Sequence, residues 1–82
     1  MDTRQKYVKL KQYNAIIIFP CHIEHSKFKN LEPITAGFCY IQENKVTCFG
    51  NSISLDLESE PEDDSKEATK QLFGYNAMLN LI

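Results

Sequence analysis

The alternation of apolar and polar side chains predicts two short β-strands in the first part of this 82-residue chain. Segment 7–11, Tyr-Val-Lys-Leu-Lys, alternates apolar and basic residues, which is typical of a half-buried or edge strand. Segment 15–19, Ala-Ile-Ile-Ile-Phe, is apolar on both faces and rich in β-branched residues, so it predicts a central strand that stops at Pro20. The polar segment 21–33 has no period, and we expect a loop there with one helical turn near 26–30.

The middle of the chain predicts a β-hairpin, in which TAGFCYI (35–41) and KVTCFG (45–50) flank a short polar turn. Pairing Ile41 with Val46 keeps the two strands consistent, because a slip of one residue would mix the side chains of the two faces. One face then carries Cys39, Ile41, Val46 and Cys48, and the other carries Phe38, Tyr40, Thr47 and Phe49.

The next segment, SISLDLES (52–59), alternates cleanly and predicts a further strand. Ile53, Leu55 and Leu57 would point into the core, whereas Asp56 and Glu58 would face water. Gly and Asn at positions 50 and 51 are a turn signal, so we expect this strand to fold back against the hairpin.

A helix is predicted after this strand. Ser59 fits an N-cap, and Glu62, three residues later, completes a capping box. The acidic residues of the first turn favour the positive end of the helix dipole. Gly74 fits the position just past the helix end.

Together these elements predict an α+β fold, in which an antiparallel sheet of about five short strands carries one helix on one face. A chain of this length forms a single domain, spanning residues 1–82.

Composition indicates a soluble cytoplasmic protein. The polar start MDTRQKYVKLKQ has no apolar signal region, and the apolar run 15–19 is too short to cross a bilayer. Three cysteines are an odd number, which agrees with a reducing compartment. Cys39 and Cys48 are placed for a cross-strand disulfide, but we expect free thiols.

Cys21, His22 and His25 are the candidate metal ligands, because Cys and His side chains bind zinc. Zinc sites usually carry two ligand pairs, whereas this chain has one cluster. A Cys–His catalytic dyad normally joins separate segments, and a small chain leaves little room for a substrate pocket. We therefore expect neither an enzyme nor a cofactor, and we interpret the cluster as loop residues. The alternative function is a small metal- or thiol-dependent domain that uses these three residues.

Three features are candidate surfaces for a protein partner: the aromatic face of the hairpin, the acidic run 56–64 and the apolar tail 77–82. Most of the acidic residues in this run are explained by their position at the start of a helix, where negative charge is favourable, so no ligand is needed to account for them. A nucleic-acid binder that uses the aromatic face is an alternative, but it is not the expected function, because no basic residues flank the aromatic residues in sequence and the RNA-recognition signature is absent. The candidate partner-binding residues are Phe38, Tyr40, Phe49, Asp56, Glu58, Glu62, Asp63, Asp64, Met78 and Leu81.

The tail predicts a homodimer. Five of the residues 77–82 are apolar, and a contiguous apolar patch exposed to water is rare in monomers. The alternative is that the tail adds a strand or a short helix to its own chain.

The stretch ITAGFCYIQENKVTCFGNSISLDLESEPEDD combines an Ala-Gly-Phe strand, a hairpin to CFGNSISL and an acidic helix start. Over about residues 34–70 it resembles small uncharacterised proteins of phages and mobile elements. This resemblance implies a bacterial cytoplasm and a protein that acts by binding, such as a phage-type inhibitor of a host or defence protein.

Overall fold

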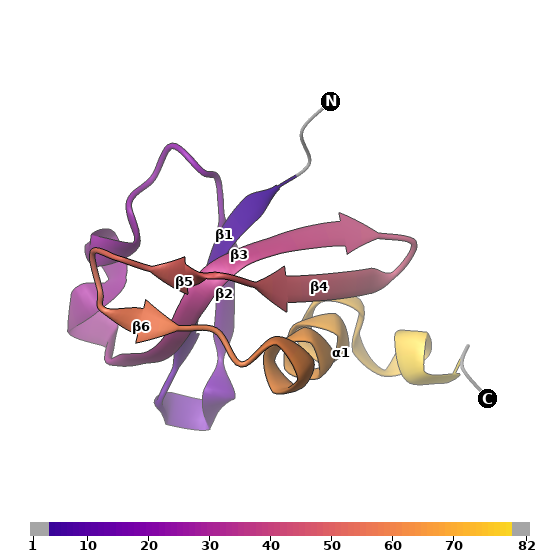
Figure 1. The fold of residues 1–82 in the computed structure, drawn as a ribbon. Coiled ribbons are helices and arrows are strands. Elements are labelled where there is room, and N and C mark those ends of the chain that lie inside the picture. Colours follow the sequence, from indigo (N-terminus) through magenta and orange to yellow (C-terminus); the bar gives the residue numbers. More distant parts are fainter. Residues whose placement is uncertain (1–3, 80–82) are drawn as a thin grey trace.

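The computed structural model describes residues 4–79, with residues 75–79 described by their backbone alone. It contains a four-stranded antiparallel sheet, a separate two-stranded sheet and one long helix, which confirms the predicted α+β class (Figure 1). Strand order in the larger sheet is β2-β1-β3-β4. The elements are β1 (Gln5–Leu10), η1 (Gln12–Asn14), β2 (Ile16–Phe19), η2 (His25–Leu31), β3 (Pro33–Gln42), β4 (Lys45–Phe49), β5 (Asn51–Ser52), β6 (Leu57–Glu58) and α1 (Pro61–Leu79), with η denoting a 3-10 helix.

The predicted roles of the first two strands are exchanged. β1 pairs with both β2 and β3 and is central, whereas the apolar β2 lies at the sheet edge. A lysine is tolerated in the central strand because Lys9 is buried beside Asp64, which comes from the helix. β2 is apolar on both faces because both of its faces are covered: Ile16 and Ile18 join the core under α1, and Ile17 joins the opposite core.

The β3–β4 hairpin has the predicted register, with Ile41 opposite Val46 and Cys39 opposite Cys48. Its turn residues, Glu43 and Asn44, have φ angles of 46° and 65°. Two left-handed residues define the two-residue turn that best matches the twist of paired strands.

The single strand predicted over 52–59 is wrong, although Leu55 and Leu57 pack against the core and Asp56 and Glu58 are exposed, as predicted. Ile53 and the next three residues form a turn between the very short β5 and β6, and Ile53 is 91% exposed. The hydroxyl of Ser52 accepts the backbone N–H of Leu55 at 3.2 Å, a local hydrogen bond that favours a turn over a ladder. Asp56 then takes a left-handed φ of 54°, which Asp tolerates. This small hairpin lies against β3 instead of extending the sheet beyond β4.

The helix start also differs from the prediction. The carboxylate of Asp64, not the Ser59–Glu62 pair, caps the first turn: it accepts the backbone N–H of Glu60 at 2.9 Å. The predicted stop at Gly74 coincides with an interruption of α1, where φ is 66° and the backbone is not helical. Figure 1 shows the shorter second piece of the helix beyond this break.

Two cores form on the two faces of the larger sheet. Under α1 lie Tyr7, Cys39, Val46 and Cys48, packed with Ala68 of the helix. On the other face, the buried residues Val8, Phe19 and Ala36 are covered by side chains of η2 and of the β5–β6 hairpin. η2 and the β5–β6 hairpin lie toward one end of the sheet, away from the turn that joins β3 to β4 (Figure 1).

The side chains of Met78 and Leu81, and with them the predicted tail interface at 77–82, lie outside the described residues. No helix among the described residues is both long and apolar enough to cross a membrane.

Candidate functional site: an aromatic face of the sheet

Three aromatic side chains form a row on the sheet face opposite α1. Phe38 lies directly opposite Phe49 in the β3–β4 register, and their ring centroids are 6.0 Å apart. Tyr40 stacks on Phe49, with centroids 5.2 Å apart and planes inclined by 15°. These residues alternate along the strands with Cys39 and Cys48, which face α1. We call Phe38, Phe49 and Tyr40 the aromatic ladder.

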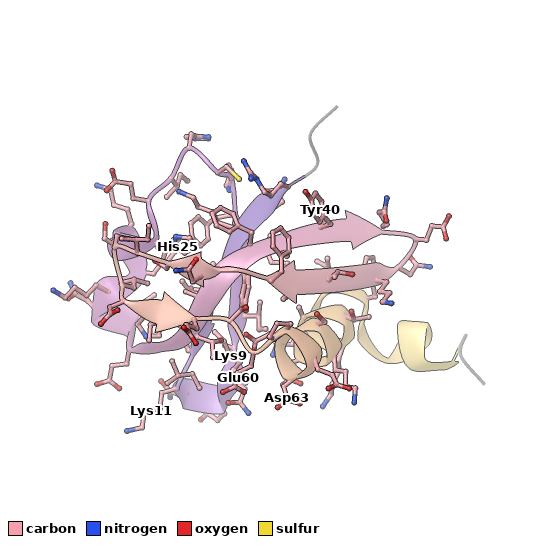
Figure 2. The ribbon with its side chains drawn as sticks, in the orientation of Figure 1. Lys9, Lys11, His25, Tyr40, Glu60 and Asp63 are labelled. Atoms are coloured by element: carbon pink, nitrogen blue, oxygen red, sulfur yellow. The ribbon has the colours of Figure 1, made fainter. Side chains whose placement is uncertain are left out.

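The aromatic ladder is open to solvent at one end and anchored in the core at the other. Tyr40 is 41% exposed, and Phe38 and Phe49 are half-buried. Figure 2 shows Tyr40 on the opposite side of the molecule from Glu60 and Asp63 at the helix start. At the inner end, the imidazole ring of His25 makes edge contacts with Phe38. The open end therefore presents aromatic surface on a pair of hydrogen-bonded strands.

Basic residues flank the aromatic ladder, contrary to the expectation from sequence. The guanidinium of Arg4 lies 5.2 Å from the centroid of the Phe38 ring, a cation–π distance. Lys6 pairs with Phe38 across β1 and β3 and so shares its face, while its ammonium donates to the carbonyl of Ile23 at 3.0 Å. Sequence reasoning missed them because more than thirty residues separate them from Phe38.

The structure gives Cys21, His22 and His25 different environments. His25 is buried, and its Nε2 lies 2.8 Å from the carbonyl oxygen of Gly37, which fits donation by a neutral ring. Burial lowers the pKa of His25, and the nearby charge of Lys6 lowers it further. His22 is exposed, and the thiol of Cys21 donates to the carbonyl of Arg4 at 3.2 Å. Within the described part of the chain, no three His, Cys, Asp or Glu side chains are grouped to hold a metal.

The acidic run divides into an exposed part and one buried residue. Asp56, Glu58, Glu62 and Asp63 are exposed, whereas Asp64 is fully buried and so offers no surface to a partner. Its Oδ1 lies 2.8 Å from Nζ of Lys9, and its Oδ2 accepts the hydroxyl of Tyr7.

The electrostatics of this buried group are consistent with an ion pair. Burial alone would raise the pKa of Asp64, but hydrogen bonds from Lys9 and Tyr7 outweigh burial and hold that pKa below its usual value. Burial would likewise lower the pKa of Lys9, but the hydrogen bond and charge of Asp64 raise it. The pKa of Tyr7 is raised by burial and by Asp64, so its hydroxyl keeps its proton and donates. Asp64 therefore fastens the helix start to the central strand.

Side chains of α1 accept hydrogen bonds from backbone N–H groups that point outward from both edges of the larger sheet. At β4, Thr69 Oγ1 accepts the N–H of Val46 at 2.9 Å, and Ser65 Oγ accepts the N–H of Cys48 at 2.7 Å. At β2, Gln71 Oε1 accepts the N–H of Ile16 at 2.8 Å. A strand of a partner that extended the sheet would have to pair with these N–H groups. Because helix side chains already accept from them, binding by strand addition is disfavoured. Sequence reasoning did not find these hydrogen bonds.

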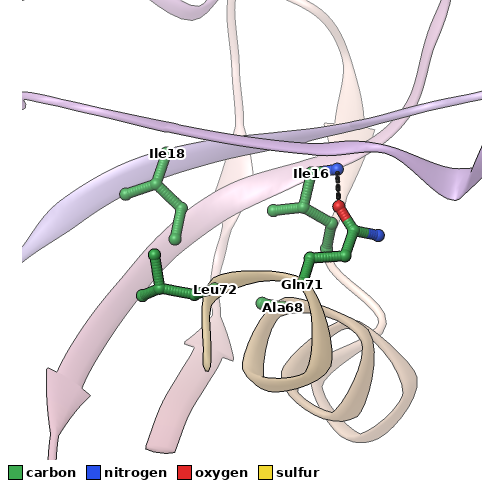
Figure 3. Close-up of a pocket in the computed structure, with 5 residues that line it drawn as sticks. All are labelled: Ile16, Ile18, Ala68, Gln71 and Leu72. Carbon is green, nitrogen blue, oxygen red and sulfur yellow. Dashed lines mark hydrogen bonds between the residues drawn. The ribbon is translucent and has the colours of Figure 1, made fainter. Parts of the chain in front are cut away.

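A small cleft lies between β2 and α1 (Figure 3). It has a volume of about 290 Å³, and Leu72 in its wall is 49% exposed. The lining residues are Ile16, Ile18, Ala68, Gln71 and Leu72. Apart from the amide of Gln71, these side chains are apolar.

In comparisons with known proteins, the chain matches no family model, and no curated protein or solved structure is significantly similar to it.

Proposed function

We propose that this protein is a non-enzymatic binding protein that recognises another protein through the aromatic ladder. The observation that carries the proposal is the stacked row of Phe38, Phe49 and Tyr40, which is exposed at Tyr40 and has Arg4 over the Phe38 ring. Tyr and Arg are enriched among the residues that dominate interface energies. Strand pairing and ring stacking also hold the rings in place before binding, which reduces the entropy lost on binding.

The burial and hydrogen bonding of His25, beside the aromatic ladder, favour a binding function over catalysis. His25 is buried, and its Nε2 is within hydrogen-bond distance of the Gly37 carbonyl. A general acid or base must reach the reacting group, and this ring nitrogen faces the protein backbone instead.

Single-stranded nucleic acid is the second candidate partner, because Arg4 and Lys6 lie beside the aromatic rings. Two observations favour protein. The stacked rings of Tyr40 and Phe49 turn faces toward each other, which leaves less ring surface for bases. The net charge of the chain is −2, which opposes binding to phosphates.

The resemblance to small phage and mobile-element proteins supports a partner in the cytoplasm of a bacterial host. Within the proposal, a phage-type inhibitor would cover part of a host or defence protein with the aromatic ladder. The exposed acidic side chains would affect the rate of association with the partner more than the affinity, because exposed charges contribute little affinity. These residues are Asp56, Glu58, Glu62 and Asp63.

Self-association is a second part of the proposed binding function. The cleft beside Leu72 is largely apolar, and five of residues 77–82 are apolar. We propose that this segment of one copy covers the cleft of a second copy in a homodimer. Sedimentation equilibrium should then show a dimer that Leu72→Asp dissociates and that Leu31→Asp, another exposed leucine, leaves intact. A monomeric wild-type protein would contradict the dimer.

Affinity capture with matched variants tests the main proposal. Tagged wild-type protein, Tyr40→Ala and Ile53→Ala are incubated with the same bacterial lysate, and the bound proteins are identified by mass spectrometry. Ile53 is the control because it is an exposed apolar residue on the β5–β6 turn and is not part of the aromatic ladder.

A protein captured by wild type and Ile53→Ala but lost with Tyr40→Ala would support the proposal. Capture that is equal for all three proteins would contradict it. Anisotropy with a fluorescent oligo-dT tests the alternative: tight, salt-dependent binding that Tyr40→Ala weakens would favour nucleic acid.

A further inference from the structure

Cys39 and Cys48 occupy a pair of positions that is suited to a cross-link. They are directly opposite in the antiparallel β3–β4 register. The N–H of Cys48 points away from β3, because it donates to Ser65 Oγ at 2.7 Å. Cys39 and Cys48 are therefore a pair without mutual backbone hydrogen bonds, for which the Cα atoms lie about 4.5 Å apart. That separation is inside the range that disulfides adopt, about 4.4–6.8 Å.

The position along the hairpin agrees with this assignment. Gln42 pairs with Lys45 beside the turn. Along the strands, pairs with mutual backbone hydrogen bonds then alternate with pairs that lack them. Val46, two residues before Cys48, also sends its N–H outward, to Thr69 Oγ1. Because the N–H groups of Val46 and Cys48 both point away from β3, the pairs that contain them lack mutual backbone hydrogen bonds. This conclusion does not depend on where the sulfur atoms lie.

Both thiols are free and share one buried environment. Cys39 and Cys48 are buried in the core under α1, together with Tyr7 and Ala68. Paired residues of a sheet project their side chains to the same face, so the two sulfurs are neighbours. Cys21 is half-buried in the loop after β2 and donates to the carbonyl of Arg4, and its charge adds to the raised pKa of Cys39.

We propose that Cys39 and Cys48 are a redox-active pair that closes to a cross-strand disulfide when the protein is exposed to a peroxide. One sulfur attacks hydrogen peroxide, the O–O bond breaks, and a sulfenic acid and one water form. The second sulfur displaces the hydroxyl group as a second water and forms the S–S bond. The two thiols lose two electrons in total, and the peroxide is reduced to water.

The environment sets the pace of this reaction. Burial raises the pKa of Cys39 to about 11 and that of Cys48 to about 12. Since the thiolate is the nucleophile, oxidation is slow at neutral pH and accelerates as the pH rises. For the peroxide to reach the two sulfur atoms, α1 must also move locally away from the hairpin. The inference is independent of the proposed function, because the thiols lie on the face opposite the aromatic ladder.

Peptide mapping after oxidation tests the pair directly. Reduced protein is treated with hydrogen peroxide at pH 7 and at pH 9, unfolded in guanidinium chloride, and alkylated with N-ethylmaleimide. Trypsin cleaves after Lys45, between the two cysteines, so a disulfide joins peptides 30–45 and 46–66. Cys21 lies on a third peptide, 12–27.

We expect alkylation to fall from three thiols to one, with the remaining label on Cys21 and with faster loss at pH 9. Cys21→Ser should form the same linked peptides, and Cys48→Ser should form none. Three alkylated thiols after exposure at both pH values would overturn the proposal. A link that involves Cys21, or one between two chains only, would also overturn it. Since the linked peptides are sought in the wild-type protein, the test does not depend on the folding of any variant.

Discussion

Nζ of Lys9 lies 2.8 Å from Oδ1 of Asp64, and both side chains are buried between the sheet and the helix. This ion pair connects the central strand to the first turn of α1, across fifty-five positions of sequence. Asp64 also accepts hydrogen bonds from Tyr7 and from the backbone of Glu60. One carboxylate therefore caps the helix and positions it on the sheet.

Asp64→Ala should strongly destabilise the fold. Removing one member of a buried ion pair leaves the other charge without compensation, which costs about 3–5 kcal/mol. Asp63→Ala is the matched control, because Asp63 is exposed in the same helical turn and should cost less than about 1 kcal/mol. The two free energies of unfolding are measured by urea denaturation at pH 7. Equal values for the two variants would contradict the role of Asp64.

Mild acid should destabilise the protein through His25. Burial lowers the pKa of His25 in the folded state, so the unfolded chain binds this proton more readily. The contribution of His25 is complete above the unfolded pKa of about 6.5 and is lost as the pH falls through the lower folded pKa. The free energy of unfolding should thus decline between pH 7 and pH 5, by at most about 1.4 kcal/mol per pH unit for one proton. His22→Gln should keep this slope and His25→Gln should remove it; an unchanged slope in His25→Gln would refute the assignment.

Thr69→Val should destabilise the β4 edge. The substitution keeps the shape of the side chain but removes the hydroxyl that holds the N–H of Val46 at 2.9 Å. Leaving a buried backbone donor without a partner costs about 1–3 kcal/mol. Lys70→Ala, at the next and exposed helix position, should change stability by no more than about 0.5 kcal/mol. Comparable denaturation midpoints for both variants would mean that the edge cap contributes nothing.

Glu43→Asn should stabilise the hairpin. Glu43 has a φ of 46°, and a left-handed conformation costs an ordinary residue roughly 1–2 kcal/mol, whereas Asn adopts it readily. We expect a gain of up to about 1 kcal/mol, read as a higher midpoint of thermal unfolding. Gln42→Asn, at the last position of β3, should give no gain because Asn is disfavoured in strands. A loss of stability in Glu43→Asn would contradict the turn geometry.

The hairpin register was predictable from sequence because a slip of one residue would have brought Phe38 and Tyr40 to the sheet face that carries Val46. The helix break at Gly74 was predictable for a local reason as well, since glycine readily adopts the positive φ found there. Both signals lie within a few residues of the structure that they specify.

The order of the first two strands was not predictable in this way. Lys9 indicates an edge strand until its partner is known, and that partner, Asp64, is distant in sequence. The turn at 53–56 was missed because one hydroxyl, that of Ser52, outweighs a clean apolar alternation. The aromatic face was found from sequence, but its basic neighbours Arg4 and Lys6 are brought to it only by the pairing of β1 with β3.

The most direct test of the central claim is the affinity of the captured partner for Tyr40→Ala, measured by isothermal titration calorimetry. If the aromatic ladder is the binding surface, loss of its exposed ring should weaken binding by about 2 kcal/mol or more, roughly thirtyfold. Ile53→Ala should bind like the wild type. An unchanged dissociation constant for Tyr40→Ala, with Ile53→Ala also unchanged, would contradict recognition through the aromatic ladder.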